Sequence, residues 1–499
     1  MNNHYNQLLD IYKDIYLLNS LEGILYWDLN TGRVPKAGLN YRTKQFNWIK
    51  RETHKRKTSE TMKKLLLLCE KDETLDSLER RNVLLLRREY ENNTIIPEDL
   101  VGKLAAQSNK TLEIWKNAKA QNKFKLVLSD MEKLFALNIE KAELLAKAKG
   151  LNDPYEALIN TRDPGVTVEL LTKIFNEAKS FLTPFIQKCV SSPTQPDLSF
   201  LSRKVPREVQ IKLNTDLANF LGYNDQISEV EHPLTIGCGP RDARVTVKYK
   251  EDQIIQAFSA CAHECGHGLH GLQRNPNSTI EPVRALSYPS LGESQSRFLE
   301  NIICGSKEFW NYYYSRFQDL TNNVFKDIDV NSFYFAINNV KPGYIRMEAD
   351  EVTYALHIII RFEIERDLFA EKVEIKELPE IWNEKYKEYL GVDVPSDTSG
   401  LMQDLHWYSQ YWGYFFGYAL GDIMNAQITM ALTQDRPDWK KSLEEGNLNP
   451  VNEWIITNVH GKGAMFDSLD MIKEITNKPL KVEYFIQYLR EKYSKLYQI

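Results

Sequence analysis

The sequence predicts a mainly α-helical protein, because helical periodicity dominates the chain and few segments show the alternation typical of strands. Of the 499 residues, 42% are hydrophobic and 26% are charged, so the chain can bury a sizeable core. Helical spacing or helix-favouring composition covers 1–21, 42–54, 59–91, 130–149, 168–190, 206–222 and 348–369. Clusters of Pro, Gly, Asn and Asp predict breaks at 191–197, 275–278, 391–400 and 435–450.

The clearest strand signal covers residues 243–249, where Val245, Val247 and Tyr249 alternate with polar side chains. This segment comes shortly before a helix that carries a metal-binding pattern, so we expect a small β-sheet beside that helix. One hypothesis is that the exposed edge of this strand pairs with an extended peptide. The alternative is an ordinary hairpin.

The metal-binding pattern is His-Glu-Cys-Gly-His at residues 263–267. On an α-helix, His263 and His267 lie one turn apart on the same face, so both imidazoles can bind one Zn²⁺ ion. Glu264 lies beside them, where a carboxylate can accept a proton from water. Apolar residues recur at helical spacing over about 252–273, which predicts that the motif lies on a helix. The alternative is a pair of helix-surface histidines with Glu264 in solvent.

A catalytic zinc ion usually has three protein ligands, and the position of the third one separates the classes of zinc enzyme. The metzincin class needs Gly at position 270 and His at position 273. This chain has His270 and Gln273 instead, which excludes that class. His270 lies one turn beyond the motif, and we interpret it as a residue that supports a ligand or lines a groove.

Three glutamates downstream are candidates for the third ligand: Glu281, Glu293 and Glu300. Glu281 precedes a proline in a loop-like stretch, so it is a poor rigid ligand. Glu293 opens a helix-like run at about 293–304 and follows His267 by 26 residues, which leaves room for a loop between two helices. We therefore predict Glu293 as the third metal ligand, with His263 and His267.

Several further short elements follow one another along the chain. They are His232-Pro233-Leu234, Asp242-Ala243-Arg244-Val245-Thr246, Glu293-Ser294-Gln295, Ile345-Arg346-Met347-Glu348-Ala349-Asp350 and Gly400-Leu401-Met402-Gln403-Asp404-Leu405-His406-Trp407. An amino-terminal element is present as Trp27-Asp28 with Thr31, Pro35 and Arg42. With the metal motif, these elements cover nearly the whole chain, and together they resemble the thermostable carboxypeptidase Taq family of zinc metallocarboxypeptidases.

The chain departs from the family pattern at a few positions. Gly292 stands where the family usually has His, Leu234 replaces Phe, and His270 stands where an aromatic residue is common. Val247 and Lys248 replace a Thr-Arg pair. None of these departures removes a predicted metal ligand or Glu264, so the resemblance implies that catalysis is retained and leaves the substrate preference open.

The resemblance implies a metal-dependent carboxypeptidase that removes single amino acids of broad type from the C-terminus of peptides by attack of zinc-activated water. In that mechanism Glu264 accepts the proton of the water and passes it to the leaving amine. Zn²⁺ is the expected metal, and Co²⁺ also suits nitrogen and oxygen ligands. The alternatives are a related helical zinc oligopeptidase or dipeptidyl carboxypeptidase, and a non-catalytic scaffold with a vestigial metal site.

The resemblance also implies which residues stabilise the oxyanion of the transition state. In related helical zinc peptidases a His and a Tyr that lie 12 residues apart have this role, and His406 and Tyr418 have that spacing here. Tyr411 and Tyr414 are competing candidates in the same aromatic segment.

A carboxypeptidase must bind a free α-carboxylate, and the bidentate guanidinium group of Arg does this best. Arg346 is our first candidate and Arg244, on the predicted strand, is the second; a structural ion pair is the alternative role for Arg346. Gln403 is predicted to bind substrate with them. Three carboxylates are candidates for orienting the histidines or the arginines: Asp242, Asp350 and Asp404.

Composition limits the partners and the compartment. The net charge is −5 and there is no basic tract, so we do not expect nucleic-acid binding. The longest apolar runs, such as 65–68 and 357–360, are far shorter than the roughly 18 residues that span a membrane.

The first twenty residues lack a continuous apolar stretch, so no signal peptide is evident. Six scattered cysteines do not form a disulfide framework, and we expect a cytoplasmic enzyme.

The family elements extend from Trp27 to His406, so we expect residues 1–499 to form a single catalytic unit rather than separate domains. The resemblance implies a helical shell around a deep active-site groove. It also implies a homodimer, although the sequence itself shows no dimer interface.

Overall fold

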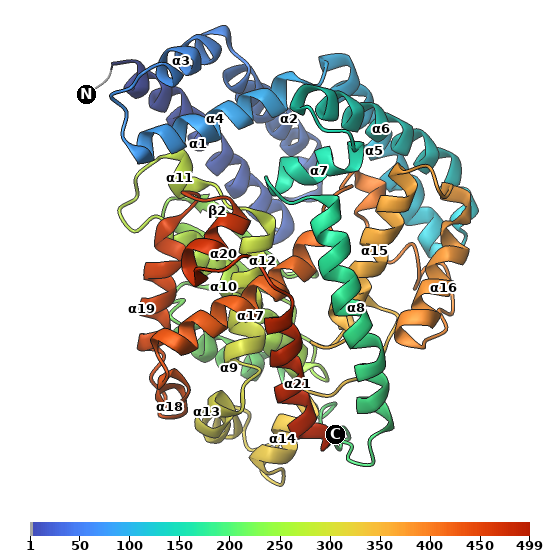
Figure 1. Cartoon of the computed structure of the whole chain (residues 1–499). Helices are drawn as coiled ribbons and strands as arrows, with labels where there is room; N and C mark the ends of the chain where they lie inside the picture. The colour runs from blue at the N-terminus through green and yellow to red at the C-terminus, as the bar shows by residue number, and fades with distance from the viewer. Residues whose placement is uncertain (1–2) are drawn as a thin grey trace.

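The computed structural model describes residues 3–499, and helices fill most of that length (Figure 1). The first helices are α1 (Asn3–Asn30), α2 (Leu39–Lys57), α3 (Glu60–Glu70), α4 (Ser77–Thr94), α5 (Glu98–Ala120), α6 (Leu128–Lys149), α7 (Pro154–Arg162), α8 (Val168–Ser191), α9 (Arg207–Leu221) and α10 (Ile254–Gln273). The later ones are α11 (Pro282–Ala285), α12 (Pro289–Arg297), α13 (Lys307–Leu320), α14 (Val330–Ile337), α15 (Tyr354–Phe369), α16 (Leu378–Leu390), α17 (Phe416–Asp435), α18 (Trp439–Glu444), α19 (Asn449–Asn458), α20 (Ser468–Thr476) and α21 (Glu483–Tyr497). The predicted mainly α-helical class is confirmed. Within the described chain, no helix has both the length and the apolar character needed to cross a membrane.

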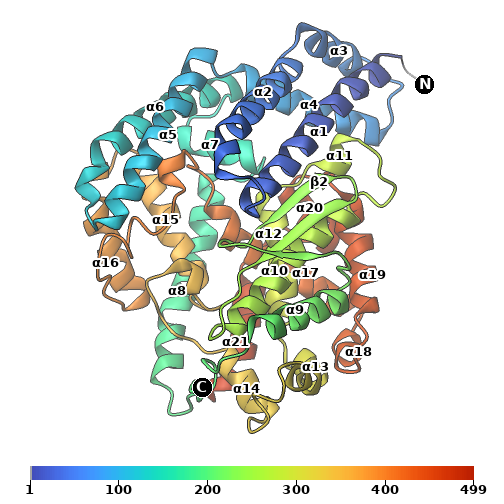
Figure 2. The ribbon, with the colours of Figure 1, turned by 180° about the vertical axis from the view of Figure 1, so that it is seen from behind.

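A small sheet of three strands lies beside α10, as Figure 2 shows. The strands are β1 (Ile227–Glu229), β2 (Thr235–Gly239) and β3 (Asp242–Val247), in the spatial order β1-β3-β2. β1 pairs with β3 in parallel and β2 pairs with it antiparallel. The predicted strand is therefore β3, and the expected sheet beside the motif helix is confirmed.

The hypothesis that the predicted strand has an exposed edge is wrong. β3 is the central strand, so its backbone groups pair with β1 on one side and with β2 on the other. An edge strand is the place where an added peptide can pair, and β3 is not one. β2 and β3 form the ordinary hairpin that was the alternative.

The long helical segment predicted at 59–91 is two helices. α3 ends at Glu70 and α4 begins at Ser77, because a capping box restarts the helix at Asp76. The Asp76 carboxylate accepts a hydrogen bond of 2.8 Å from the backbone N–H of Glu79, and the Glu79 carboxylate accepts one of 3.0 Å from the N–H of Asp76. This spacing of Asp and Glu is a helix start that the sequence carries.

Three other predicted segments differ from the structure by more than a few residues. The helix predicted at 1–21 continues to Asn30, and its first two residues lie outside the described part. The helix predicted at 348–369 begins only at Tyr354. The break predicted at 435–450 contains α18, whose Trp439 is only 1% exposed and anchors that short helix in the core.

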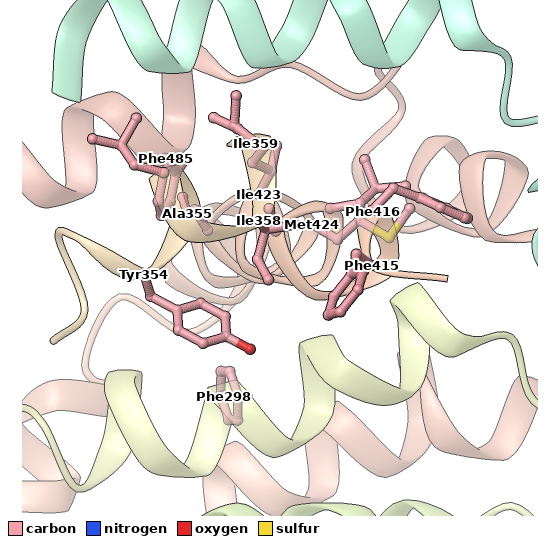
Figure 3. Close-up of a cluster of buried hydrophobic side chains, with 14 of the residues drawn as sticks. Phe298, Tyr354, Ala355, Ile358, Ile359, Phe415, Phe416, Ile423, Met424 and Phe485 are labelled. Carbon is pink, nitrogen blue, oxygen red and sulfur yellow. The ribbon is translucent and has the colours of Figure 1, made fainter. Parts of the chain in front are cut away.

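The central core joins α12, α15, α17 and α21. Figure 3 shows Tyr354 of α15 pointing towards Phe298, which follows α12, and Ile358 of α15 near Ile423 of α17. α15 is buried on nearly all sides, which is typical of a helix in the interior of a large domain. A helix in this position can hold side chains of neighbouring segments at fixed positions.

Candidate metal centre and active site

The structure brings together the three side chains that were predicted as metal ligands. His263 and His267 lie on α10 and Glu293 lies on α12, and one ligand atom from each is within 4.8 Å of the others. The Glu293 carboxylate oxygens lie 3.8 Å from Nε2 of each histidine. Two ligands of a tetrahedral zinc ion lie about 3.4 Å apart. The donor set therefore fits a divalent metal with small adjustments. The histidine side chains are 21% and 25% exposed, so the centre is open to solvent.

Glycines let the helices that carry these ligands approach closely. A Cβ atom on Gly266 would lie 2.5 Å from the Ser296 Cα, and one on Gly421 of α17 would lie 2.8 Å from the Glu293 Cβ. Contacts of this length are too short for any side chain, so glycine is required at both positions. The short helix α12 is thus held between α10 and α17, which sets the distance from Glu293 to the histidines.

We expect Gly266→Ala to lower the free energy of unfolding by about 1–3 kcal/mol or more, because its methyl group would push backbone atoms of α12 away. The same displacement should weaken metal binding, which can be measured as metal retained per chain after dialysis. Gly271→Ala on the same helix is the matched control, since its Cβ would meet the nearest atom at an ordinary 3.8 Å. An equal loss of metal in both variants would contradict the role of close packing.

Glu300 orients the first histidine of the motif. Nδ1 of His263 donates a hydrogen bond of 2.9 Å to Glu300, which directs Nε2 towards Glu293 and His267. Burial alone would raise the pKa of Glu300, but Arg297 and the hydrogen bonds from His263 and Ser259 lower it to about 2. Glu300 is therefore ionised and acts as the acceptor.

The sequence placed Glu300 among the candidate ligands and not among the orienting groups. Glu300 follows Glu293 by seven residues, which is about two helical turns. This spacing places both side chains on the same side of a helix, and it is the feature of the sequence that indicates that Glu300 also faces α10. The helix containing them was expected at about 293–304. It begins four residues earlier, at Pro289, and passes after Arg297 into a π-helical turn, Phe298–Ile303, that carries Glu300.

Thr235 of β2 holds the carboxylate of Glu264. The Thr235 hydroxyl donates to Glu264 Oε2 at 2.7 Å and also lies 3.0 Å from the Glu264 backbone oxygen. Glu264 is 8% exposed, so this hydrogen bond restricts a largely buried side chain. The sheet therefore has a role at the site, although a different one from that expected for β3.

Arg346 lies in a buried cluster with Asp404 and Arg361. Asp404 accepts from Nη2 of Arg346 at 2.8 Å and from Nη2 of Arg361 at 2.7 Å. Burial opposes ionisation of Asp404, but the two guanidinium groups hold its pKa well below the usual range. Two arginines share one carboxylate, so the cluster carries one net positive charge.

Gln403 supports Arg346 through the backbone. Its Oε1 accepts a hydrogen bond of 2.8 Å from the N–H of Arg346. Its Nε2 donates to the backbone oxygens of Tyr344, Ser399 and Gly400. The side chain is thus committed to holding the two chain segments together, and the predicted contact of Gln403 with substrate stays a prediction.

His406 and Tyr418 lie near one another and near Arg346. Their ring centroids are 6.4 Å apart, and the Arg346 guanidinium lies 5.3 Å from the Tyr418 ring. Burial lowers the pKa of His406 to about 4 despite the opposing charge of Asp404, so its imidazole is neutral at pH 7. Its buried Nδ1 has no hydrogen-bond partner among residues 3–499.

Tyr414 and Tyr418 lie next to each other, with ring centroids 5.6 Å apart, and both lie near His406. Burial is the main cause that raises the pKa of both phenols, and the charge of Glu293 adds to it. Tyr411 is 43% exposed, and the Arg162 guanidinium lies over both the Tyr411 and the Tyr414 ring. The structure therefore groups Tyr418 with Arg346 and His406, and Tyr414 is the more buried of the two competing tyrosines.

Arg244 lies on β3 and pairs with a neighbour on the same strand. Asp242 accepts two hydrogen bonds from it, at 2.8 and 2.7 Å, and the guanidinium lies 5.6 Å from the Trp27 ring. The expectation that Arg244 lies on an edge strand is wrong, since β3 is central.

The three carboxylates that were candidates for orienting the histidines or the arginines bind groups other than the predicted metal-binding histidines. Asp404 and Asp242 bind arginines, as described. Asp350 accepts from the backbone N–H groups of Lys341, Val352 and Thr353. The prediction that these groups orient arginines is thus correct for Asp242 and Asp404, and it is wrong for Asp350.

His270 lies inside the protein next to His460. The two ring centroids are 4.9 Å apart, and burial holds the pKa of His270 well below its usual value. His460 bridges α10 and α12, because its ring nitrogens lie 2.6 Å from Gln273 Oε1 and 3.0 Å from Gln295 Oε1. His270 belongs to the packing behind the metal centre, and the ligand cluster does not include it.

The start of α12 is held by Asp163, which the sequence did not indicate. The Asp163 carboxylate accepts from the backbone N–H and the hydroxyl of Ser290 and from the Ser468 hydroxyl. Burial raises the pKa of Asp163 to about 6 although these donors lower it. This contact places the first turn of the helix that carries Glu293.

The chain is similar to known proteins over nearly its whole length. A profile of the family described as Carboxypeptidase Taq (M32) metallopeptidase matches residues 7–493. The chain is 35% identical over 497 residues to carboxypeptidase 1 of Bacillus subtilis, with 98% of each chain covered. It is 32% identical over 511 residues to thermostable carboxypeptidase 1 of Thermus thermophilus, with 99% of each covered.

Solved structures give the same result. The crystal structure of the M32 carboxypeptidase from Deinococcus radiodurans R1 matches with a TM-score of 0.96 at 28% identity and covers 100% of both chains. The resemblance carried by the short sequence elements is therefore confirmed over the full length. The chain belongs to the carboxypeptidase Taq (M32) family of metallopeptidases and is a metallocarboxypeptidase.

Proposed function

We propose that the protein releases single amino acids of broad type from the free C-terminus of peptides, with His263, His267 and Glu293 holding one divalent metal. Two imidazole nitrogens and one carboxylate oxygen within 4.8 Å are a donor set that suits Zn²⁺, our first choice, and also Co²⁺. When bound, such a metal polarises the scissile carbonyl and makes water more acidic. The protein residues then perform the proton transfers.

Glu264 acts first as a base and then as an acid. One carboxylate oxygen takes a proton from the attacking water, and the same proton passes to the nitrogen of the leaving amino acid. The hydrogen bond of 2.7 Å from Thr235 fixes Oε2, and we assign the proton transfer to Oε1. Thr235 keeps the carboxylate in one orientation during both transfers.

His406 and Tyr418 donate hydrogen bonds to the developing oxyanion. A neutral imidazole and a protonated phenol are both donors at pH 7, and the pKa values of His406 and Tyr418 favour these forms. The position of Tyr418 beside both Arg346 and His406 supports this role.

Arg346 binds the C-terminal carboxylate of the peptide. The observation that carries this proposal is the buried cluster in which two arginines share the single carboxylate of Asp404. An additional carboxylate would neutralise its remaining positive charge, and burial strengthens that attraction. Arg346 is itself 5% exposed and lies against Tyr418, which ties the cluster to the catalytic residues.

Mass spectrometry of an unblocked peptide over time tests the proposal. We expect a ladder that shortens by one residue per step, loss of the ladder with a chelator, and its return with Zn²⁺. The same peptide with an amidated C-terminus should remain intact. Cleavage of the amidated peptide would support a zinc oligopeptidase instead, and release of two residues per step would support a dipeptidyl carboxypeptidase.

Arg346→Lys should lower kcat/KM for the unblocked peptide by about 10- to 100-fold, because Lys cannot form the bidentate, charge-assisted contact. The loss should appear mainly as a higher KM. Arg361 still pairs with Asp404 in this variant, so a cooperative thermal transition should remain. Arg244→Lys is the matched control, and a larger effect there would make Arg244 the carboxylate-binding residue.

We also propose that the protein forms a homodimer and that it is located in the cytoplasm. Large apolar side chains are exposed on α1 and α2, which suits a surface covered by a partner. They are Leu17, Leu21, Tyr26, Leu29, Leu39, Tyr41 and Trp48. All six cysteines are buried thiols, as is usual in a reducing compartment. Light scattering of the purified chain, with Trp48→Glu as a dissociating variant, tests the dimer, and cell fractionation tests the compartment.

A further inference from the structure

Two charged residues on α15 are completely buried and lie one helical turn apart. Arg361 and Glu365 are both 0% exposed, and α15 runs through the interior beside α17 and α8 (Figure 1). Residues four apart on a helix point to the same side. Both side chains reach the segment 404–413, which precedes α17 and contains His406.

Arg361 binds the beginning of this segment. Its Nε and Nη2 donate to Asp404 Oδ2 at 2.9 and 2.7 Å. Its Nη1 donates to the backbone oxygen of His357 at 2.6 Å, which fixes the guanidinium on its own helix. Asp404 is therefore attached to α15 as well as to Arg346.

Glu365 binds the same segment at two further points. One oxygen accepts from Nε1 of Trp407 at 2.6 Å, and the other accepts from the N–H of Gly413 at 3.1 Å and from the Tyr155 hydroxyl at 2.7 Å. Gly413 has a φ of +64°, a left-handed conformation that glycine adopts without strain. The two ends of the stretch from Trp407 to Gly413 are thus hydrogen-bonded to the same carboxylate.

The burial of Glu365 has no evident benefit for stability. Burial raises the pKa of this carboxyl to about 7 even though its three donors favour the charged form. An apolar side chain in such a position is often as stabilising as a buried charged group, or more so. The contacts to Trp407 and Gly413 are what a hydrophobic residue could not supply.

We propose that Glu365 and Arg361 are positioning residues that hold the segment 404–413, so that His406 stays beside Tyr418 and Arg346 in the proposed active site. This inference rests on the proposed roles of His406 and Arg346. The two helix residues attach three points, Asp404, Trp407 and Gly413, on both sides of His406. They act through this segment and do not contact the substrate.

Glu365→Gln tests the inference, with Glu363→Gln as the matched control. Glu363 is a buried glutamate on the same helix, but its oxygens accept from Lys179, Lys385 and Tyr389, away from the segment. Both variants should be less stable than the wild type. Glu365→Gln alone should lower kcat by about 10- to 100-fold with little change in KM, as misplaced catalytic groups do.

Hydrogen exchange of peptides from 404–418 gives a readout that does not depend on activity. The amide of Gln has one acceptor oxygen where the carboxylate has two, so it cannot accept from both Trp407 and Gly413, and exchange of the Gly413 amide should accelerate by about 10-fold or more in Glu365→Gln. Glu363→Gln should exchange like the wild type in this region. If the wild type releases no amino acid from peptides, the proposed function is wrong. The hydrogen-exchange result would still show whether Glu365 holds the segment 404–413.

The inference is wrong if Glu365→Gln leaves both kcat and exchange at wild-type values, or if Glu363→Gln changes them equally. Should Glu365→Gln not fold, Trp407→Phe and Tyr155→Phe replace it as a pair. Trp407→Phe removes one attachment of the segment and should lower kcat by about 10-fold. Tyr155→Phe leaves both attachments in place and should keep kcat within about twofold. Equal losses in the pair would overturn the inference.

Discussion

Glu264→Gln should lower kcat by about 10²- to 10⁴-fold, which is the contribution typical of a general acid–base residue. The amide has almost the same shape as the carboxylate and can still accept the hydrogen bond from Thr235, so α10 and the metal ligands keep their places. It cannot take up the proton of the attacking water. We expect this loss in initial-rate measurements on an unblocked peptide, with the metal content per chain unchanged.

Glu281→Gln is the matched control for this experiment. Glu281 precedes the short helix α11 and makes no side-chain cap to it, so its loss should leave both activity and metal content intact. Retention of activity in Glu264→Gln with the metal bound would mean that another residue is the base. An inactive wild type with a fully loaded metal site would instead favour the vestigial scaffold.

Glu293→Ala should remove most of the bound metal and, with it, the activity. Glu293 is the one charged ligand of the predicted set, and its two oxygens lie 3.8 Å from the two histidine nitrogens. The two remaining imidazoles lie on one helix and would hold the ion without a charged ligand. We expect metal affinity, measured by competition with a chromophoric chelator, to fall by more than the roughly 100-fold typical of losing an orienting partner.

Glu300→Gln provides the comparison, because Glu300 was also a candidate ligand. It hydrogen-bonds to Nδ1 of His263 and is not part of the ligand cluster, so its loss should weaken metal binding by about 10- to 100-fold. The expected order of metal loss is thus Glu293→Ala first and Glu300→Gln second. The reverse order would assign the third ligand to Glu300.

Local patterns in the sequence were sufficient for the helical class and for the metal-binding motif. Helical periodicity depends on residues within a few turns, and the spacing of His263 and His267 depends on one turn only. The strand at β3 and the helix at α10 were predicted within a few residues for the same reason. Where the pattern misled, as in the single helix expected at 59–91, a cap at Asp76 interrupts a continuous apolar periodicity.

The groups that surround the motif could not be predicted in the same way. Thr235 contacts Glu264 from a strand 29 residues earlier in the chain, and Asp163 contacts Ser290 across 127 residues. Neither pair shares a periodic pattern. The sheet order was also beyond local reasoning, because the parallel pairing of β1 made β3 a central strand and removed the expected edge.

The sequence by itself determined the chemistry of this protein: two histidines and a glutamate on one helical turn, a downstream glutamate, and a series of short elements that resembles one family. The tertiary structure alone decided how these groups are held. It placed Glu300 behind His263, paired both Arg346 and Arg361 with Asp404, and closed the segment 404–413 over Glu365. The physical reason is that residue type and local spacing set what a side chain can bind, whereas its orientation depends on contacts between segments that are far apart in the chain.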